Sequence, residues 1–214
     1  IPKIVSVDPT LRSENAQKIK PPSNCPSCGS TAEHFEEDVE WRCQNKNCNA
    51  QQKEQILHFV SRRAMDIDTI GPALIEQLMH KRLLENAADL YLLSHKDLSK
   101  LDRMGNKSAG NVLAGIDKSK QCTLSQFIHA LGITNVGEKT AGILAQHFGT
   151  LEKLMSAERE DLEMIEEIGP VTAGNTFFFF RDPEKKQFIA NFLERGVQPM
   201  EVQILKISDS PFSG

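Results

Sequence analysis

Four cysteines close together in the sequence are the residues best suited to chemistry. Cys25 and Cys28 form a C-x2-C pair, and Cys43 and Cys48 form a C-x4-C pair after fourteen intervening residues. Four thiolates at this spacing are typical of tetrahedral Zn²⁺, and a shell closed by four sulfurs leaves no position open for catalysis. Two disulfides are the alternative, which is disfavoured because no export signal is present and a reducing compartment is expected. We therefore predict one structural zinc ion.

Other candidate catalytic residues are weaker. Asp66 and Asp68 form a D-x-D pair that suits a metal-dependent nuclease, but helix capping and turn formation before Gly71 explain the pair better. Cys122 is predicted to be a small packed side chain rather than a nucleophile. The sequence contains no phosphate loop of the G-x-x-x-x-G-K-[ST] type, no G-x-G-x-x-G dinucleotide motif and no Asp-Gly. We predict no self-sufficient active site.

A repeated unit fills most of the chain after the cysteines. Four glycines, each preceded by an apolar residue, are separated by 34, 32 and 32 residues. We interpret each unit as a helix, a tight turn that glycine permits, and a second helix that begins with unpaired N–H groups, where a phosphate can bind. The glycines are Gly71, Gly105, Gly137 and Gly169; the apolar residues expected to fill the gap between the helices are Ile70, Met104, Val136 and Ile168; and the small residues expected to allow close packing are Ala109, Ala141 and Ala173.

Charge differs between the repeats. Residues 99–147 contain six lysines and arginines against three acids, a net charge of +3, whereas residues 148–170 contain two against seven, a net charge of −5. The second and third repeats are therefore expected to meet phosphates, and the fourth is expected to be mainly structural. Lys107 and Lys139 lie two residues after their glycines, where an ammonium reinforces a phosphate site; a solvated helix surface is the alternative for each.

The elements that position these residues indicate a mainly α-helical fold. We assign residues 1–22 to a strand and a proline-bearing linker, 23–57 to the zinc finger, 58–198 to a four-repeat helical domain, and 199–214 to a tail. Residues 177–180 are four phenylalanines, which on a helix point around the whole cylinder and cannot all face one core. No stretch approaches 18 apolar residues, so no membrane span is expected.

The order of these parts resembles the carboxy-terminal half of the bacterial NAD-dependent DNA ligases. Four runs carry the resemblance: Cys43-x4-Cys48-Asn49-Ala50-Gln51, His58-Phe59-Val60-Ser61-Arg62-Arg63-Ala64-Met65-Asp66-Ile67-Asp68, Ala88-Asp89-Leu90-Tyr91, and Ala130-Leu131-Gly132-Ile133-x-x-Val136-Gly137-Glu138. The resemblance implies that residues 1–7 end an OB-fold and that residues 210–214 open a BRCT domain. It also implies that the catalytic lysine, NAD and Mg²⁺ belong to an adenylation domain outside this sequence.

The resemblance further implies a function in replication and repair, in the bacterial cytoplasm at the nucleoid. The helix-hairpin-helix domain would grip nicked duplex DNA through its backbone, without regard to sequence, and would contact the missing OB-fold, adenylation and BRCT domains. The predicted DNA-binding residues are Gly71, Arg103, Gly105, Lys107, Gly137, Lys139 and Thr140. The alternative is a DNA-binding module of a repair nuclease or of a polymerase accessory protein.

One departure from the hairpin motif affects these expectations. The motif often has a second glycine two residues before the first, where this sequence has Thr69, Arg103, Asn135 and Glu167. A Cβ at that position is expected to narrow the approach of the backbone to a phosphate. Glu167 adds a negative charge, which weakens the case for phosphate binding at the fourth repeat.

Overall fold

The computed structural model of the chain describes residues 6, 8–13, 15–17, 20–34 and 41–202. These residues belong to two compact units, residues 1–50 and residues 51–214. The strand expected over residues 1–8 falls almost entirely outside the described residues, and so does the expected start of a BRCT domain at residues 210–214. No helix among the described residues has both the length and the apolar composition to span a bilayer.

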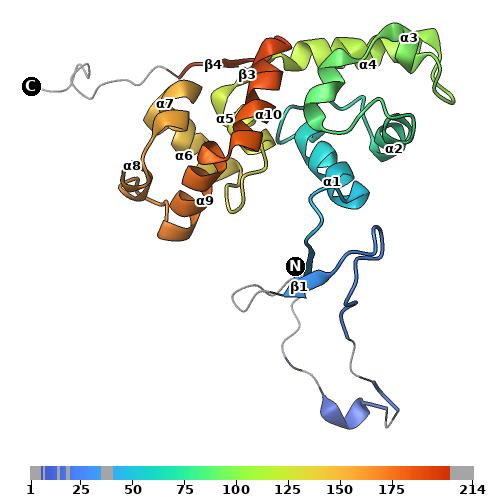
Figure 1. Ribbon diagram of the computed structural model, residues 1–214, viewed down its shortest axis with the longest axis vertical. Helices are drawn as coiled ribbons and strands as arrows, with labels where there is room; N and C mark the ends of the chain where they lie inside the picture. The colour runs from blue at the N-terminus through green and yellow to red at the C-terminus, as the bar shows by residue number, and fades with distance from the viewer. Residues whose placement is uncertain (1–5, 7, 14, 18–19, 35–40, 203–214) are drawn as a thin grey trace, which may run out of the picture. The chain divides into compact units, whose positions relative to one another are not determined.

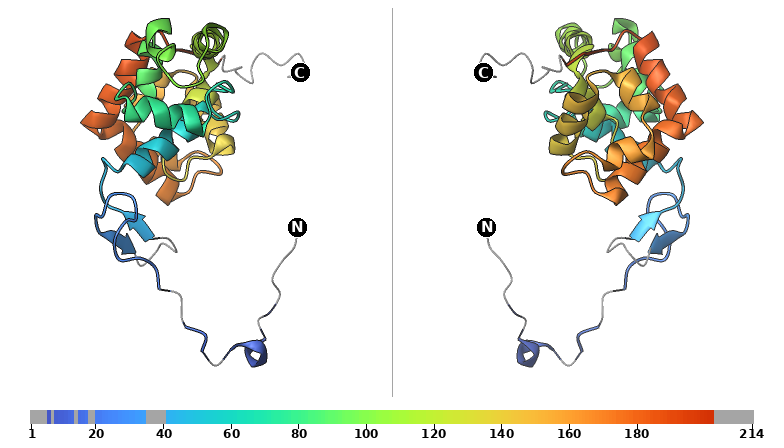
Figure 2. Two further views of the ribbon diagram at one scale, coloured as in Figure 1. Left: turned by 90° about the vertical axis from the view of Figure 1, so that its right-hand side faces the viewer. Right: turned by 90° about the vertical axis from the view of Figure 1, so that its left-hand side faces the viewer.

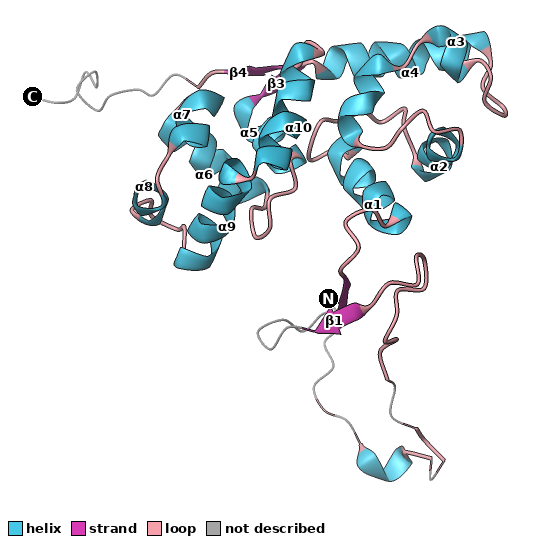
Figure 3. Cartoon of the chain, in the orientation of Figure 1, coloured by secondary structure: helices cyan, strands magenta, loops and turns pink. Residues whose placement is uncertain are grey.

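The first unit contains little regular structure. A short 3-10 helix, η1, covers Pro9–Leu11, and two strands, β1 (Ala32–His34) and β2 (Trp41–Cys43), pair antiparallel (Figure 3). The register places Ala32 opposite Cys43 and His34 opposite Trp41. This pairing brings the second pair of cysteines back to the first.

The second unit is helical and contains four helical hairpins (Figure 1), which confirms the expected mainly α-helical fold. We number the hairpins one to four by their glycines. Their paired helices are α1 (Asn49–Val60) with α2 (Pro72–His80), α3 (His95–Leu98) with α4 (Asn106–Ser119), α5 (Leu124–Ala130) with α6 (Glu138–Phe148), and α8 (Arg159–Glu163) with α9 (Pro170–Arg181). The intervening helices are η2 (Ala87–Leu92), α7 (Leu151–Ser156) and α10 (Pro183–Glu194), and β3 (Gln121–Thr123) pairs parallel with β4 (Gln198–Met200).

Most helices of this unit that are not the second helix of a hairpin begin at a residue whose side chain caps them. In each case a side-chain oxygen accepts a hydrogen bond from a backbone N–H of the first turn, which satisfies one of the donors that a helix leaves unpaired. The capping residues are Asn86 for η2, Ser94 for α3, Thr123 for α5, Thr150 for α7 and Asp182 for α10. The second helix of every hairpin lacks such a cap, as described below.

The core of the helical unit centres on Phe192 of α10, which is fully buried. Its ring stacks on Phe59 of α1, with centroids 4.9 Å apart and planes 10° apart. Tyr91 of η2 and Phe127 of α5 meet the same ring edge-on at 5.9 and 5.7 Å. One aromatic side chain therefore joins helices from both halves of the unit; Figure 2 shows the helices of this unit from two opposite sides.

The four consecutive phenylalanines of α9 do not share one environment, as expected. Phe180 is only 2% exposed, whereas Phe178 is 63% exposed, and Phe177 and Phe179 are half-buried. Arg181 lies over the ring of Phe177 with its guanidinium carbon 4.9 Å from the centroid. The helix thus contributes one phenylalanine to the core and leaves another in solvent.

Truncating the central ring tests this description of the core. Phe192→Ala should lower the free energy of unfolding by about 3–5 kcal/mol, because it removes a buried ring and leaves a cavity. The exposed Phe178→Ala should change it by less than about 0.5 kcal/mol. Urea unfolding followed by helical circular dichroism measures both, and equal losses would contradict the central place of Phe192.

Candidate zinc site and nucleic-acid interface

The four predicted zinc ligands lie together in the first unit. The Sγ atoms of Cys25 and Cys48 are 3.8 Å apart, those of Cys28 and Cys43 are 3.4 Å apart, and all four lie within 4.8 Å of one another. A tetrahedral zinc ion with Zn–S bonds of about 2.3 Å would place its sulfurs about 3.8 Å apart. The donor set and its spacing therefore fit one structural zinc ion with no open coordination position.

Local backbone geometry aims the first pair of sulfurs. Gly29 has φ +73°, a left-handed conformation that glycine adopts without steric cost, and its N–H donates to the Cys25 carbonyl at 2.9 Å. The Cys25 N–H in turn donates to the Ser30 carbonyl at 2.7 Å. The C-x2-C pair thus lies in a tight turn, with glycine at the position that requires a left-handed conformation.

Hydrogen bonding and burial shift the pKa values of two of these thiols in opposite directions. The hydroxyl and N–H of Ser30 lower the pKa of Cys28 to about 6. The N–H of Asn45 favours the Cys43 thiolate, but burial and the neighbouring sulfurs of Cys28 and Cys25 raise its pKa to about 12. Two adjacent thiolates repel each other, so a divalent cation that binds here must displace the proton from Cys43.

All four repeat glycines are N-caps of the second hairpin helix. Their φ values lie between −110° and −78° with extended ψ, a conformation that any residue adopts, and none has a side-chain cap. A Cβ built at any of the four would meet nothing within 4 Å. Neither the backbone nor the packing of the chain requires glycine at Gly71, Gly105, Gly137 or Gly169.

The prediction that these glycines make the tight turn is therefore wrong in its location. The left-handed residue of the turn lies two positions earlier, at Arg103 (φ 59°), Asn135 (φ 64°) and Glu167 (φ 71°). This is the position at which the hairpin motif often has glycine, and a Cβ makes that conformation less favourable. The first hairpin differs. Thr69 lies two positions before its glycine, but the residue with positive φ is Asp66 (φ 52°), three residues before Thr69.

Packing inside the hairpins follows the expected pattern. The apolar residue before the glycine is buried in three repeats, at Ile70, Val136 and Ile168, and Met104 is half-buried. The alanines four residues after the glycine, Ala109, Ala141 and Ala173, are fully buried. The burial of these residues agrees with the roles predicted from their types and spacing, and Met104 is the least buried of them.

The first two helical positions separate the hairpins into two kinds. The first and fourth hairpins, which we call the outer hairpins, have Pro72 and Pro170 directly after the glycine, and proline has no N–H to offer. The second and third, the middle hairpins, keep that N–H, and each carries lysine at the next position. The residues at that next position are Ala73, Lys107, Lys139 and Val171 in chain order.

The predicted DNA-binding residues are accessible to different degrees. Five are exposed, namely Arg103, Gly105, Lys107, Gly137 and Lys139, and two are half-buried, namely Gly71 and Thr140. The structure does not bring all of them into one cluster of contacting side chains. Each middle hairpin carries its own exposed glycine and lysine.

Two ion pairs join the third hairpin to its neighbours. The Arg63 Nε lies 4.0 Å from a carboxylate oxygen of Glu138, which links the first hairpin to the third. Lys139 pairs with Glu167, which links the third hairpin to the fourth. Arg63 is not among the residues predicted to bind DNA, although two adjacent arginines before the first hairpin turn are a visible signal. Neither pairing could be predicted from the sequence, because each joins residues far apart in the chain.

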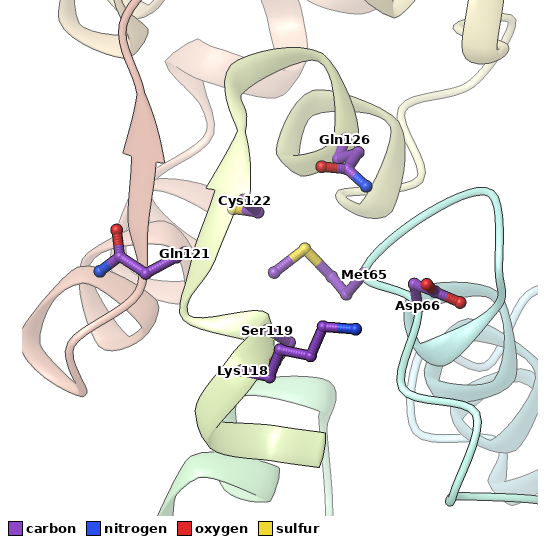
Figure 4. A pocket seen from close by; sticks show the side chains of 7 residues that line it. All are labelled: Met65, Asp66, Lys118, Ser119, Gln121, Cys122 and Gln126. Carbon is purple, nitrogen blue, oxygen red and sulfur yellow. The ribbon is translucent and has the colours of Figure 1, made fainter. Parts of the chain in front are cut away.

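A small pocket borders the first hairpin turn (Figure 4). Its volume is about 110 Å³, well below the range of about 300–1,000 Å³ that is usual for small-molecule sites. It is lined by Met65, Asp66, Lys118, Ser119, Gln121, Cys122 and Gln126. Burial raises the pKa of Cys122 to about 11, so this thiol is protonated at neutral pH and packs as expected.

Asp66 and Asp68 gain no support as a nuclease site. Within the part of the chain that the structure describes, the four cysteines are the one group of three or more His, Cys, Asp or Glu residues able to hold a metal ion. Neither aspartate belongs to it. The D-x-D pair is explained by the turn that Asp66 makes.

Removing the metal tests the zinc site. A chelator should unfold residues 24–50, because thiolates and a metal replace a hydrophobic core in so small a module. Trp41, the single tryptophan of the chain, lies on β2 beside the cysteines and should report the change by fluorescence, while helical circular dichroism is largely retained.

The affinity for zinc should also depend on pH. With the pKa of Cys43 at about 12, each binding event releases at least one proton, so affinity should fall at least about tenfold per pH unit on acidification. Cys122→Ser is the matched control, because that thiol lies in the helical unit and should leave one zinc per chain. A zinc content near zero in the untreated protein would contradict the assignment.

Comparison with known families agrees with both sites. Residues 24–50 match the NAD-dependent DNA ligase C4 zinc finger domain, residues 61–118 a SAM-like helix-hairpin-helix tandem, and residues 126–189 a helix-hairpin-helix motif. DNA ligases of Methylococcus capsulatus, Hahella chejuensis and Marinobacter nauticus are 46%, 45% and 41% identical over 92%, 100% and 100% of this chain. The chain covers 29–32% of the length of these relatives. By its zinc finger, its tandem hairpins and this similarity, the chain matches one part of the NAD-dependent DNA ligases.

Proposed function

We propose that this chain is the DNA-binding, non-catalytic portion of an NAD-dependent DNA ligase, an enzyme that seals nicks in duplex DNA. The observation that carries the proposal is the open space at the four glycine N-caps. A serine or aspartate there would cap the helix with its side chain and stabilise it by a few tenths of a kcal/mol relative to glycine. The missing side chain instead leaves N–H groups open to an anion from outside, at the positive end of the helix dipole.

The middle hairpins are the phosphate-binding ones in this proposal. At Gly105 and Gly137 the first helical residue keeps its N–H, and Lys107 or Lys139 follows. The outer hairpins lose that donor to proline and have alanine or valine where the lysines stand. Backbone donors and lysines that contact phosphates carry no sequence information, so binding is expected to be independent of base sequence.

The remaining assignments concern the full-length ligase. NAD, Mg²⁺ and the adenylated lysine belong to other parts of it, and so do the OB-fold, adenylation and BRCT domains that this portion would contact. The zinc finger supports the proposal, because its match to the ligase finger favours a ligase over a repair nuclease or a polymerase accessory protein. The site of action is the bacterial cytoplasm, at the nucleoid.

Neutralising the two lysines tests the phosphate contacts. Lys107→Gln and Lys139→Gln should each weaken binding to a nicked duplex equally for unrelated sequences, and each should reduce the slope of log affinity against log salt by about 0.9. A titration by fluorescence anisotropy at several salt concentrations measures both quantities. Lys153→Gln, which removes an equal charge from the acidic segment of residues 148–170, is the control and should leave the slope unchanged.

Introducing a side-chain cap at these glycines should change protein stability and DNA binding in different ways. Gly105→Ser should raise the free energy of unfolding by up to about 1 kcal/mol, because the unfolded chain loses conformational entropy and the hydroxyl caps α4. It should weaken DNA binding, because the new side chain fills the approach to the N–H groups. Gly169→Ser is the matched control, since its glycine has the same cap geometry on an outer hairpin. It should stabilise the protein without weakening DNA binding; equal loss of binding in both variants would count against the middle hairpins.

A further inference from the structure

Glu167 lies beside Lys139, the cation that the proposed function assigns to phosphate binding. It is the left-handed turn residue of the fourth hairpin, and its carboxylate pairs with the Lys139 ammonium at the start of α6 in the third hairpin. The side chains are 78% and 52% exposed for Lys139 and Glu167, so the pair lies at the surface. The lysine that we assign to phosphate binding is therefore already in contact with an anionic group of the chain itself.

The arrangement distinguishes the third hairpin from the second. Lys107 holds the equivalent position of the second hairpin and forms no ion pair with any described residue. The residue two positions before the glycine is Thr69, Arg103 or Asn135 in the other hairpins, so an acid occurs two positions before the glycine in the fourth hairpin alone. The two middle hairpins share a backbone geometry but differ in the charge that surrounds the lysine.

The other charged groups beside Lys139 balance each other. Glu138 precedes it on α6, and Arg63 of the first hairpin lies 4.0 Å from that carboxylate. Arg63 and Glu138 together add no net charge, so Glu167 decides whether Lys139 presents a positive charge to solvent. Among the ion pairs of the described residues, the contact between Lys139 and Glu167 is thus the pairing that changes the charge Lys139 can offer to a phosphate.

We propose that Glu167 competes with DNA phosphate for Lys139 and thereby sets the affinity of the third hairpin. This inference rests on the proposed phosphate-binding function of Lys139. Carboxylate and phosphate oxygens are both acceptors for an ammonium, and an exposed ion pair is weak enough for a charge-dense duplex to displace it.

The test compares two neighbouring glutamates. Glu167→Gln should tighten binding to a nicked duplex by about three- to five-fold at low salt, because Lys139 no longer exchanges an internal partner for phosphate. Glu166→Gln removes the same charge one residue earlier, from an exposed side chain with no ion pair among the described residues, and should tighten binding less than about two-fold. Thermal unfolding of both variants checks that the fold is kept.

Repeating Glu167→Gln and Glu166→Gln in the Lys139→Gln background completes a double-mutant cycle for each glutamate. The gain from Glu167→Gln should disappear in that background, whereas the small effect of Glu166→Gln should persist. If Lys139→Gln weakens binding but the two glutamate variants behave alike, the inference is overturned and the proposed function stands. If Lys139→Gln leaves binding and salt slope unchanged, the role of Lys139 fails and the inference fails with it.

Discussion

The buried ring of Phe192 is the interaction on which the helical unit depends. A hairpin of two short helices has too little apolar surface to be stable alone, so the hairpins must share a core. Phe192 supplies the shared centre, because Phe59 from the start of the unit and Phe127 from its middle both pack on it. Beside it, Arg195 at the end of α10 pairs with Asp89 of η2 at 3.1 Å, with both side chains largely buried. The last helix thus holds the earlier ones at fixed positions, and with them the hairpin ends that face solvent.

At the glycine N-caps the helices lack a stabilising side-chain cap, and their first N–H groups stay accessible to solvent. The helices that only connect the hairpins follow the ordinary capping rule with asparagine, threonine or aspartate. The second helix of each hairpin does not, although nothing in the chain would obstruct a side chain there. Proteins commonly keep such locally unfavourable choices at functional positions. The outer hairpins retain the glycine but lose a donor to proline, which leaves the middle hairpins with the complete set of groups for a phosphate.

Charge refines what the backbone makes possible. The backbone geometry at Gly105 and Gly137 is nearly the same, yet Lys107 stands among solvent while Lys139 is held by Glu167. Equal local motifs therefore need not have equal affinities, since a neighbour distant in sequence can occupy the group that binds. The zinc finger has a separate task in this arrangement, because its four sulfurs close the metal shell and stabilise residues that have little core of their own.

The sequence by itself determined the metal ligands, the number of hairpins and the mainly helical fold, because cysteine spacing and a repeated glycine are local signals that need no knowledge of distant contacts. It placed the buried alanines correctly for the same reason. It put the tight turn at the wrong residue, since the φ angle of Arg103 or Asn135 depends on how the two helices are packed and not on residue type alone. The stacking of Phe59 on Phe192 and the pairing of Lys139 with Glu167 were decided only by the tertiary structure. Both contacts join residues far apart in the chain, and long-range packing leaves no periodic trace in the sequence.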